Sequence, residues 1–268
     1  MKFENSLTRI LVAIIFIPVL LAASYFGEIY FLIFNLLIGT AGFFELKRML
    51  LKKNIFIGNL PLAASLLLIL NAYYKFNNVS NIFLMSLVLI LIFELFNNRE
   101  SAIHNLGGNF LAVFYPGFLL SIIIYLRDLF GTGYQGGLLI ITIFISIWMC
   151  DSGAYFIGSA IGKHKLFPRV SPKKSWEGAA AGLIFGILGT VLSKIIIVDF
   201  LTWSDAIVIG SIVGTFGQIG DLIESLLKRD AQIKDSSNII PGHGGILDRF
   251  DSFFISAPLI YFYFRNFY

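Results

Sequence analysis

Apolar runs recur along almost the whole chain and are separated by short polar segments. A membrane-spanning helix needs about 20 predominantly apolar residues, so the shorter runs are expected to extend into their flanks. The pattern predicts an all-α, polytopic integral membrane protein with about nine transmembrane helices. The runs lie at 10–26, 29–44, 60–74, 81–96, 107–126, 136–150, 178–198, 204–227 and 252–264.

Composition supports this class of protein. Of the 268 residues, 57% are hydrophobic and only 13% are charged, and a soluble core could not bury so much apolar surface. The first run follows Lys2 and Arg9, as the apolar part of a signal peptide would. Because it opens a series of similar runs, we predict a retained helix. The single cysteine, Cys150, excludes an intrachain disulfide and is expected to pack in an apolar run.

The distribution of basic residues predicts the orientation. With nine spans, the N-terminus and every second loop lie on one side, which carries sixteen of the 20 Lys and Arg residues. Cytoplasmic loops carry the excess of Lys and Arg, so the N-terminus is predicted to be cytoplasmic. The net charge of +4 follows from these loops and indicates no nucleic-acid partner. The basic loop at 45–53 is explained by an anionic inner leaflet and requires no binding site.

Ionisable residues are concentrated in the second half of the chain. The first five spans have few of them, so residues 1–130 are predicted to be a transmembrane scaffold. Residues 131–268 are predicted to carry the chemistry, with cytoplasmic loops at 151–177 and 228–251. Charge beside a bilayer is costly unless it is solvated or functional, which makes these two loops the candidate site.

Small and ionisable residues follow one face of the eighth span, in steps of three and four. They are Gly210, Gly214, Gly217, Asp221, Glu224, Ser225 and Lys228. The glycines favour close helix packing. Two carboxylates one turn apart in a membrane helix must be paired, protonated or bound to a cation, and oxygen ligands favour a hard ion such as Mg²⁺. A salt bridge from Glu224 to Lys228 is the alternative that needs no metal.

The loop after this helix contains a glycine-flanked histidine and two aspartates. Glycines on both sides of His243 would let the backbone approach a ligand closely, as phosphate-binding loops do. His243 is expected to hydrogen-bond a phosphate, with general-acid chemistry as the alternative. Asp248 and Asp251 precede the last span, where Asp251 also fits a helix N-cap.

A second polar segment follows the sixth span. Asp151 interrupts an apolar stretch and is therefore expected to face a cavity. Lys173 and Lys174 offer two ammonium groups at the membrane surface, and Trp176 suits an anchor at the depth of the headgroups. The alternative reading is that the two lysines only enforce topology.

Together these residues resemble the phosphatidate cytidylyltransferases, also called CDP-diacylglycerol synthases. The family signature runs from a Ser followed by Lys-Arg, through Lys-Asp and His-Gly-Gly, to Asp-Arg-apolar-Asp, and 225–251 matches it at every specified position. Cys-Asp-Ser-Gly-Ala-Tyr at 150–155 and Ser-Pro-Lys-Lys-Ser-Trp-Glu-Gly at 171–178 also resemble the family. Ser175 stands where the family usually has Thr. The close match covers about the last 120 residues, and the remainder agrees only in being apolar.

The resemblance implies transfer of CMP from CTP to phosphatidate, giving CDP-diacylglycerol and pyrophosphate. It implies a bacterial inner-membrane protein with a cytoplasmic active site, whose partners are CTP, phosphatidate and membrane lipids, and it allows a homodimer. The attacking lipid phosphate is already ionised, so no strong base is required. Metal ions and lysines can neutralise the two anionic substrates and the leaving pyrophosphate.

The resemblance, together with this chemistry, assigns a role to each candidate residue. One or two Mg²⁺ ions would be held by Asp221, Asp248 and Asp251, with Glu224 as the weaker candidate. The catalytic group comprises these three aspartates together with Lys228 and His243. The substrate-binding residues are Lys173, Lys174, Ser225, Arg229, Lys234, Arg249 and Asp151.

Three other functions are considered. An ion-coupled membrane transporter would also carry intramembrane carboxylates and glycine-rich helices, but here the polar groups cluster at one level and no repeat is visible. A CTP-dependent polyprenol or lipid kinase is closer in chemistry. A CDP-alcohol phosphotransferase would carry a short Asp-rich motif that this chain lacks.

Overall fold

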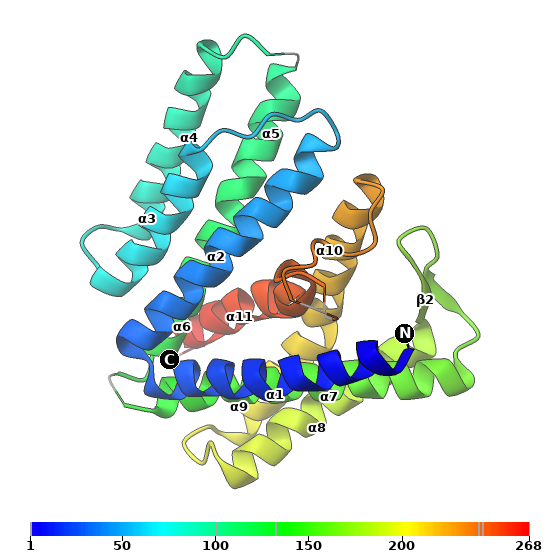
Figure 1. Cartoon of the computed structure of the whole chain (residues 1–268). Coiled ribbons are helices and arrows are strands. Elements are labelled where there is room, and N and C mark those ends of the chain that lie inside the picture. The colour runs from blue at the N-terminus through cyan, green and yellow to red at the C-terminus, as the bar shows by residue number, and fades with distance from the viewer. Residues whose placement is uncertain (1, 100, 132, 241, 243, 268) are drawn as a thin grey trace. The chain divides into compact units, whose positions relative to one another are not determined.

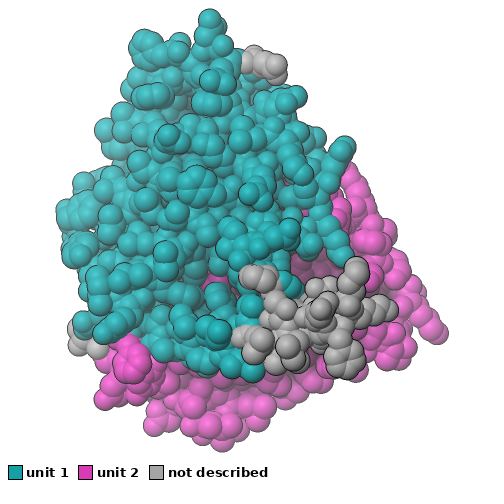
Figure 2. All heavy atoms as spheres, viewed as in Figure 1, with its two compact units in different colours: residues 1–23, 27–125, 230–249 teal, residues 24–26, 126–229, 250–268 magenta. Residues whose placement is uncertain are grey.

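The computed structural model describes residues 2–99, 101–131, 133–240, 242 and 244–267, with side chains described from residue 12 onward. The chain divides into two compact units (Figure 2). Unit 1 comprises residues 1–23, 27–125 and 230–249, and unit 2 comprises residues 24–26, 126–229 and 250–268.

Unit 1 is built of helices that follow one another through short turns (Figure 1). They are α1 (Lys2–Phe26), α2 (Glu28–Leu51), α3 (Leu60–Tyr74), α4 (Val79–Leu95) and α5 (Ala102–Val113), which continues through the π-helical turn η1 (Phe114–Phe118) into α6 (Leu119–Asp128). Leu68, Ile90 and Val113 belong to the core that α3, α4 and α5 share. Pro116 lies in η1, where a proline removes one helical hydrogen bond, which accounts for the irregular turn.

Unit 2 contains the remaining helices and one short β-hairpin. The helices are α7 (Gln135–Ile161), α8 (Trp176–Ile196), α9 (Trp203–Ile212), which continues through the π-helical turn η2 (Val213–Gly217) into α10 (Gln218–Asp230), and α11 (Leu247–Phe267), which enters unit 2 at Phe250. Between α7 and α8, β1 (Lys165–Phe167) pairs antiparallel with β2 (Ser171–Ser175). Helices α7 and α8 run side by side along much of their length (Figure 1).

The helices agree with the predicted apolar runs. Across the described ranges, each run falls on one continuous helical segment and extends at most two residues beyond it, whereas several segments are longer than the run by five residues or more. Among the described residues, five segments are long and apolar enough to cross a membrane, and three further apolar helices are shorter. A mainly helical protein with several helices capable of spanning a membrane is therefore confirmed. The count of nine spans and the cytoplasmic N-terminus stay predictions.

The segment predicted as the loop 151–177 differs from expectation. Helix α7 continues through Asp151 to Ile161, because no proline interrupts 152–161. It ends there, with Gly162 as its C-cap residue. The β-hairpin then departs from the all-α prediction. Its strands are three and five residues long and mostly exposed or half-buried, so they carry no alternation of apolar and polar residues by which a strand is recognised.

Glycines bring the backbones of α8 and α9–η2 into direct contact. A Cβ atom on Gly210 would lie 2.5 Å from the Cα of Ile187, and one on Gly214 would lie 2.7 Å from the Cα of Leu183. The close approach also lets the Thr190 hydroxyl donate to the carbonyl of Ala206 at 2.6 Å. The close-packing interpretation of these two glycines is confirmed.

We predict that Gly210→Ala destabilises the protein by about 1–3 kcal/mol, because the added methyl group overpacks the α8–α9 contact. Gly107→Ala is the matched control, since a Cβ atom there meets nothing within 4 Å and alanine is the better helix former. Thermal unfolding in detergent checks both variants. Equal midpoints for the two variants would contradict the packing argument.

Candidate functional site

Lys174 and Asp221 form an ion pair within unit 2. The Nζ atom of Lys174, on β2, lies 2.7 Å from Oδ2 of Asp221, on α10. The hydroxyl of Ser225 donates to Oδ1 of the same carboxylate at 3.3 Å. The side chains of Lys174 and Asp221 are 25% and 34% exposed, so solvent and ligands can reach the pair. The hairpin that the sequence did not predict thus carries one predicted site residue to two others.

Glu224 and Lys228 pair one turn further along α10. The Nζ atom of Lys228 contacts Oε2 of Glu224, whose side chain is completely buried. The salt bridge that the four-residue spacing allows is therefore present. Removing one partner of a buried ion pair leaves an uncompensated charge and typically lowers stability by about 3–5 kcal/mol. The burial of the Glu224 carboxylate therefore depends on Lys228. A metal-binding role for Glu224 stays a prediction.

A close approach of α10 and α11 places Asp251 near Asp221. A Cβ atom on Gly220 would lie 2.5 Å from the carbonyl oxygen of Asp251, so the two backbones touch beside Asp221. The Asp251 carboxyl group interacts electrostatically with Asp221, Asp151 and Lys228. Its Oδ1 atom accepts a hydrogen bond from the backbone N–H of Ser252 at 2.6 Å. Unit 2 therefore gathers three of the predicted carboxylates and two predicted cations, Lys174 and Lys228.

The N-cap expected at Asp251 is not found. Helix α11 begins at Leu247, one turn earlier than the apolar pattern indicates, so Asp251 lies inside the helix. The earlier start is made possible by a carboxylate from α2 that accepts the first backbone N–H groups of α11.

Cys150 and Asp151 lie on the part of α7 that packs against α8. Cys150 is buried, as expected, and interacts electrostatically with Asp151, Lys174 and Asp221. Asp151 is exposed. Gly182 on α8 allows the packing, because a Cβ atom there would lie 3.2 Å from Sγ of Cys150.

The remaining cations of unit 2 that were predicted as site residues lie at its surface. Arg229 is exposed, and its Nε atom donates to the carbonyl of Val170 in the hairpin turn at 3.3 Å. Lys173 is exposed on β2.

In unit 1, Asp248 holds the loop that carries most of the signature. Its Oδ2 atom accepts hydrogen bonds from the backbone N–H groups of Ser236, at 2.9 Å, and Gly245, at 2.8 Å, and lies 2.8 Å from the Ser236 hydroxyl. Gly244 adopts a φ of +84°, which a residue with a side chain rarely adopts. Asp248 therefore joins the two ends of this loop.

Three predicted residues of the loop remain. Lys234 and Arg249 are exposed in the loop and at the start of α11. His243 lies outside the described residues.

Glu45 is the residue that the sequence reasoning missed. It lies on α2 with 1% of its surface exposed, and it accepts four hydrogen bonds from the signature loop. The sequence analysis placed it in the basic loop 45–53, which an anionic inner leaflet seemed to explain without a binding site. An isolated carboxylate directly after an apolar run was the available indication.

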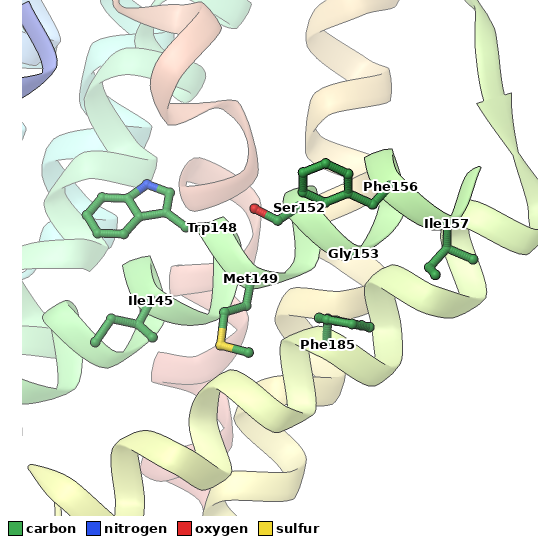
Figure 3. A pocket seen from close by; sticks show the side chains of 8 residues that line it. All are labelled: Ile145, Trp148, Met149, Ser152, Gly153, Phe156, Ile157 and Phe185. Carbon is green, nitrogen blue, oxygen red and sulfur yellow. The ribbon is translucent and has the colours of Figure 1, made fainter. Parts of the chain in front are cut away.

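An apolar cavity of about 400 Å³ lies along α7 and α8 in unit 2. Figure 3 shows Phe185 of α8 facing Met149 and Ile157 of α7. The Ser152 hydroxyl and the Trp148 indole nitrogen are the polar atoms drawn at its wall. The cavity is therefore mainly apolar and lies along the same helix that carries Asp151.

Comparison with known proteins defines the family. Residues 7–267 match the model of the cytidylyltransferase family. The chain is 35% identical over 270 residues to the phosphatidate cytidylyltransferase of Bacillus subtilis (strain 168), covering 97% of this chain and 96% of the relative. It is 34% identical over 262 residues to the phosphatidate cytidylyltransferases of Staphylococcus saprophyticus and Staphylococcus aureus (strain COL), covering 96% of each chain. The chain belongs to the cytidylyltransferase family.

We predict that Gly220→Ala lowers cytidylyl transfer by about tenfold or more, because small displacements of reacting groups can cost up to about 100-fold in rate. The added methyl group would push the Asp251 backbone away from Asp221. Gly217→Ala is the control, since its nearest contact outside the turn would be an ordinary 3.6 Å to Cβ of Ser252. Rates are compared at equal amounts of membrane-inserted protein. Equal loss in both variants would refute the positional argument.

Proposed function

We propose that this chain is a phosphatidate cytidylyltransferase, which transfers CMP from CTP to phosphatidate and releases pyrophosphate. The observation that carries the proposal is the Lys174–Asp221 pair beside Asp251, at the meeting point of β2, α10 and α11 in unit 2. Family membership and nearly full-length similarity to proteins of that name support it.

In the proposed reaction, a phosphate oxygen of phosphatidate attacks the α-phosphorus of CTP. The new P–O bond forms as the bond to the β-phosphate breaks, and the leaving pyrophosphate carries the electron pair. The lipid phosphate is ionised near neutral pH, so no residue needs to remove a proton from it. The requirement is to bring two anions together, which cations satisfy by neutralisation and orientation.

Among the described residues, no group of three or more His, Cys, Asp or Glu side chains is placed to hold a metal ion. Within unit 2, the carboxyl groups of Asp221 and Asp251 interact electrostatically, and carboxylate oxygens are the ligands that Mg²⁺ takes. We infer that these two residues contribute to binding one or two Mg²⁺ ions, and Asp248 stays a candidate ligand on the ground of the sequence motif alone. Glu224 is the weaker candidate because Lys228 already pairs with it. Bound Mg²⁺ would neutralise the triphosphate and the leaving pyrophosphate.

Lys174 has a specific role in this proposal. Its ammonium group pairs with Asp221. A cation on Asp221 would compete with that pair and make Lys174 available to a phosphate oxygen. Lys228 retains Glu224 as its partner and contributes a fixed positive charge. We further propose that the exposed cations Lys173, Arg229, Lys234 and Arg249 contact phosphate groups of the substrates. Ser225 and His243 would act as neutral donors, and Asp151 is a further substrate-binding candidate.

The proposal includes the environment of the enzyme. Nine spans, a cytoplasmic N-terminus and a cytoplasmic active site in a bacterial inner membrane are consistent with the helices capable of spanning a membrane and with the distribution of Lys and Arg. A homodimer is compatible with the mechanism and is not required by it.

The apolar cavity along α7 and α8 is proposed to receive an acyl chain of phosphatidate. It is lined almost entirely by apolar side chains, it belongs to two helices capable of spanning a membrane, and one of its lining residues, Ser152, follows Asp151 in the chain. A diacyl lipid is the substrate that needs both a phosphate site and an apolar channel beside it.

Membranes containing the chain are expected to convert labelled CTP and phosphatidate into CDP-diacylglycerol and pyrophosphate in the presence of Mg²⁺. Asp221→Asn and Asp251→Asn should each lower the rate by about 100-fold or more, since even partners of metal ligands contribute 10–100-fold. Asp199→Asn, at an exposed acid between α8 and α9, is the matched control. Full activity in either site variant would contradict the metal assignment. Release of CDP would indicate a kinase, and ion flux without lipid turnover would indicate a transporter.

Ser152→Phe should fill the cavity and raise the KM for phosphatidate about fivefold, leaving the KM for CTP unchanged. A loss of about 1 kcal/mol of packing corresponds to that factor. Ser159→Phe is the control, because Ser159 is exposed on the same helix and does not line the cavity. Initial rates are measured against the mole fraction of phosphatidate in mixed micelles. An unchanged KM would remove the acyl chain from this cavity.

A further inference from the structure

The signature loop is the segment 236–247, of which the structure describes 236–240, 242 and 244–247. We propose that Glu45 is a positioning residue that sets the conformation of the described part of this loop and the direction of the Asp248 carboxylate. Glu45 belongs to α2, in the half of the chain whose spans look like scaffold by sequence. All the contacts concerned lie within unit 1.

The first argument is the set of donors that surrounds Glu45. Its Oε1 atom accepts from the Ser237 hydroxyl at 2.5 Å and the Ile246 backbone N–H at 2.9 Å. Its Oε2 atom accepts from the Ser236 hydroxyl at 2.8 Å and the Leu247 backbone N–H at 2.9 Å. A carboxylate is an acceptor only, and every one of these partners can donate. With 1% of the residue exposed, the buried charge depends on them.

The second argument concerns the start of α11. The first backbone N–H groups of a helix have no partner within it, and the positive end of the helix dipole favours an anion there. A neighbouring Ser, Thr, Asp or Asn usually supplies the cap. Here the cap is the Glu45 carboxylate, which reaches Ile246 and Leu247 from a different helix and from the other end of the sequence.

The third argument is steric. A Cβ atom on Gly245 would lie 1.9 Å from the Ser236 hydroxyl oxygen and 2.4 Å and 2.5 Å from the Glu45 carboxylate oxygens. Gly42, one turn before Glu45 on α2, would place its Cβ atom 3.1 Å from Cδ2 of Leu247. Glycine at both positions therefore allows the loop to close over Glu45.

Ser236 connects Glu45 to Asp248. Its hydroxyl oxygen lies 2.8 Å from Oε2 of Glu45 and 2.8 Å from Oδ2 of Asp248. The same Asp248 oxygen accepts the N–H groups of Ser236 and Gly245. The plane of the Asp248 carboxylate is therefore set by the loop that Glu45 holds. The effect on catalysis rests on the proposed function, whereas the effect on the loop does not.

Hydrogen–deuterium exchange of the peptide covering 236–249 tests the proposal on the full-length protein in detergent. Glu45→Gln replaces one acceptor oxygen by an NH₂ group that faces two donors. The peptide should exchange about tenfold faster or more, because hydrogen bonds to charged groups are among the stronger ones. Glu45→Asp keeps both acceptors on a shorter side chain and should restore part of the protection.

Glu94→Gln is the matched control. Glu94 also accepts from side chains of unit 1, those of Asn97 and Asn105, and among the described residues it forms no hydrogen bond or ion pair with the loop, so exchange at 236–249 should not change. In parallel, Glu45→Gln should lower kcat for CDP-diacylglycerol formation about tenfold or more while the KM for CTP changes less than twofold. Glu94→Gln should leave both constants unchanged.

The outcomes separate the two proposals. Unchanged exchange in Glu45→Gln would overturn the positioning role, and faster exchange with unchanged kcat would overturn its effect on catalysis. If the wild-type chain forms no CDP-diacylglycerol while Glu45→Gln still loosens the loop, the proposed function fails and the loop assignment stands. If Glu45→Gln does not fold, Ser237→Ala removes a single donor to Glu45, and unchanged exchange in that variant would refute the proposal.

Discussion

A carboxylate buried among apolar helices must obtain its hydrogen-bond donors or its counter-ion from the protein itself. The two units meet this requirement in different ways. In unit 1, Glu45 collects four neutral donors from one loop. In unit 2, Glu224 is paired by a lysine one turn along its own helix. Burying a charge without partners is prohibitively costly. The segments that donate hydrogen bonds to these carboxylates, or pair with them, must therefore adopt the conformation that brings their polar groups to the carboxylate.

Asp221 shows the contrasting case of a carboxylate that keeps partial exposure. Its partners, Lys174 and Ser225, come from a hairpin and from the same helix, and water reaches the pair. An exposed ion pair contributes little to stability, so the value of this arrangement lies in its ability to exchange partners. A buried carboxylate whose hydrogen bonds are all made within the protein stabilises the fold, whereas a partly exposed ion pair can exchange its partner for a ligand. The same residue types thus serve different purposes according to burial.

Glycine makes these arrangements geometrically accessible. At Gly210 and Gly214 the absence of a side chain brings two helices together, at Gly220 it brings α10 against α11 beside two carboxylates, and at Gly245 it leaves room for a carboxylate itself. Only the first use could be anticipated from spacing along a helix. The other two depend on which atom lies opposite the glycine, and that atom belongs to a residue distant in sequence or across a helix contact.

Periodicity and composition alone determined the helical segments and the membrane class, because apolar runs long enough to span a bilayer have few other stable arrangements. The charged motifs alone indicated the family and most candidate residues, including the Glu224–Lys228 pair, which is a local contact. Only the tertiary structure decided the hairpin that carries Lys174, the earlier start of α11 and the role of Glu45. Each of these depends on contacts between segments far apart in the chain. The hydrogen bonds of a buried carboxylate are satisfied in space, and the order of residues along the chain does not record which distant donors will reach it.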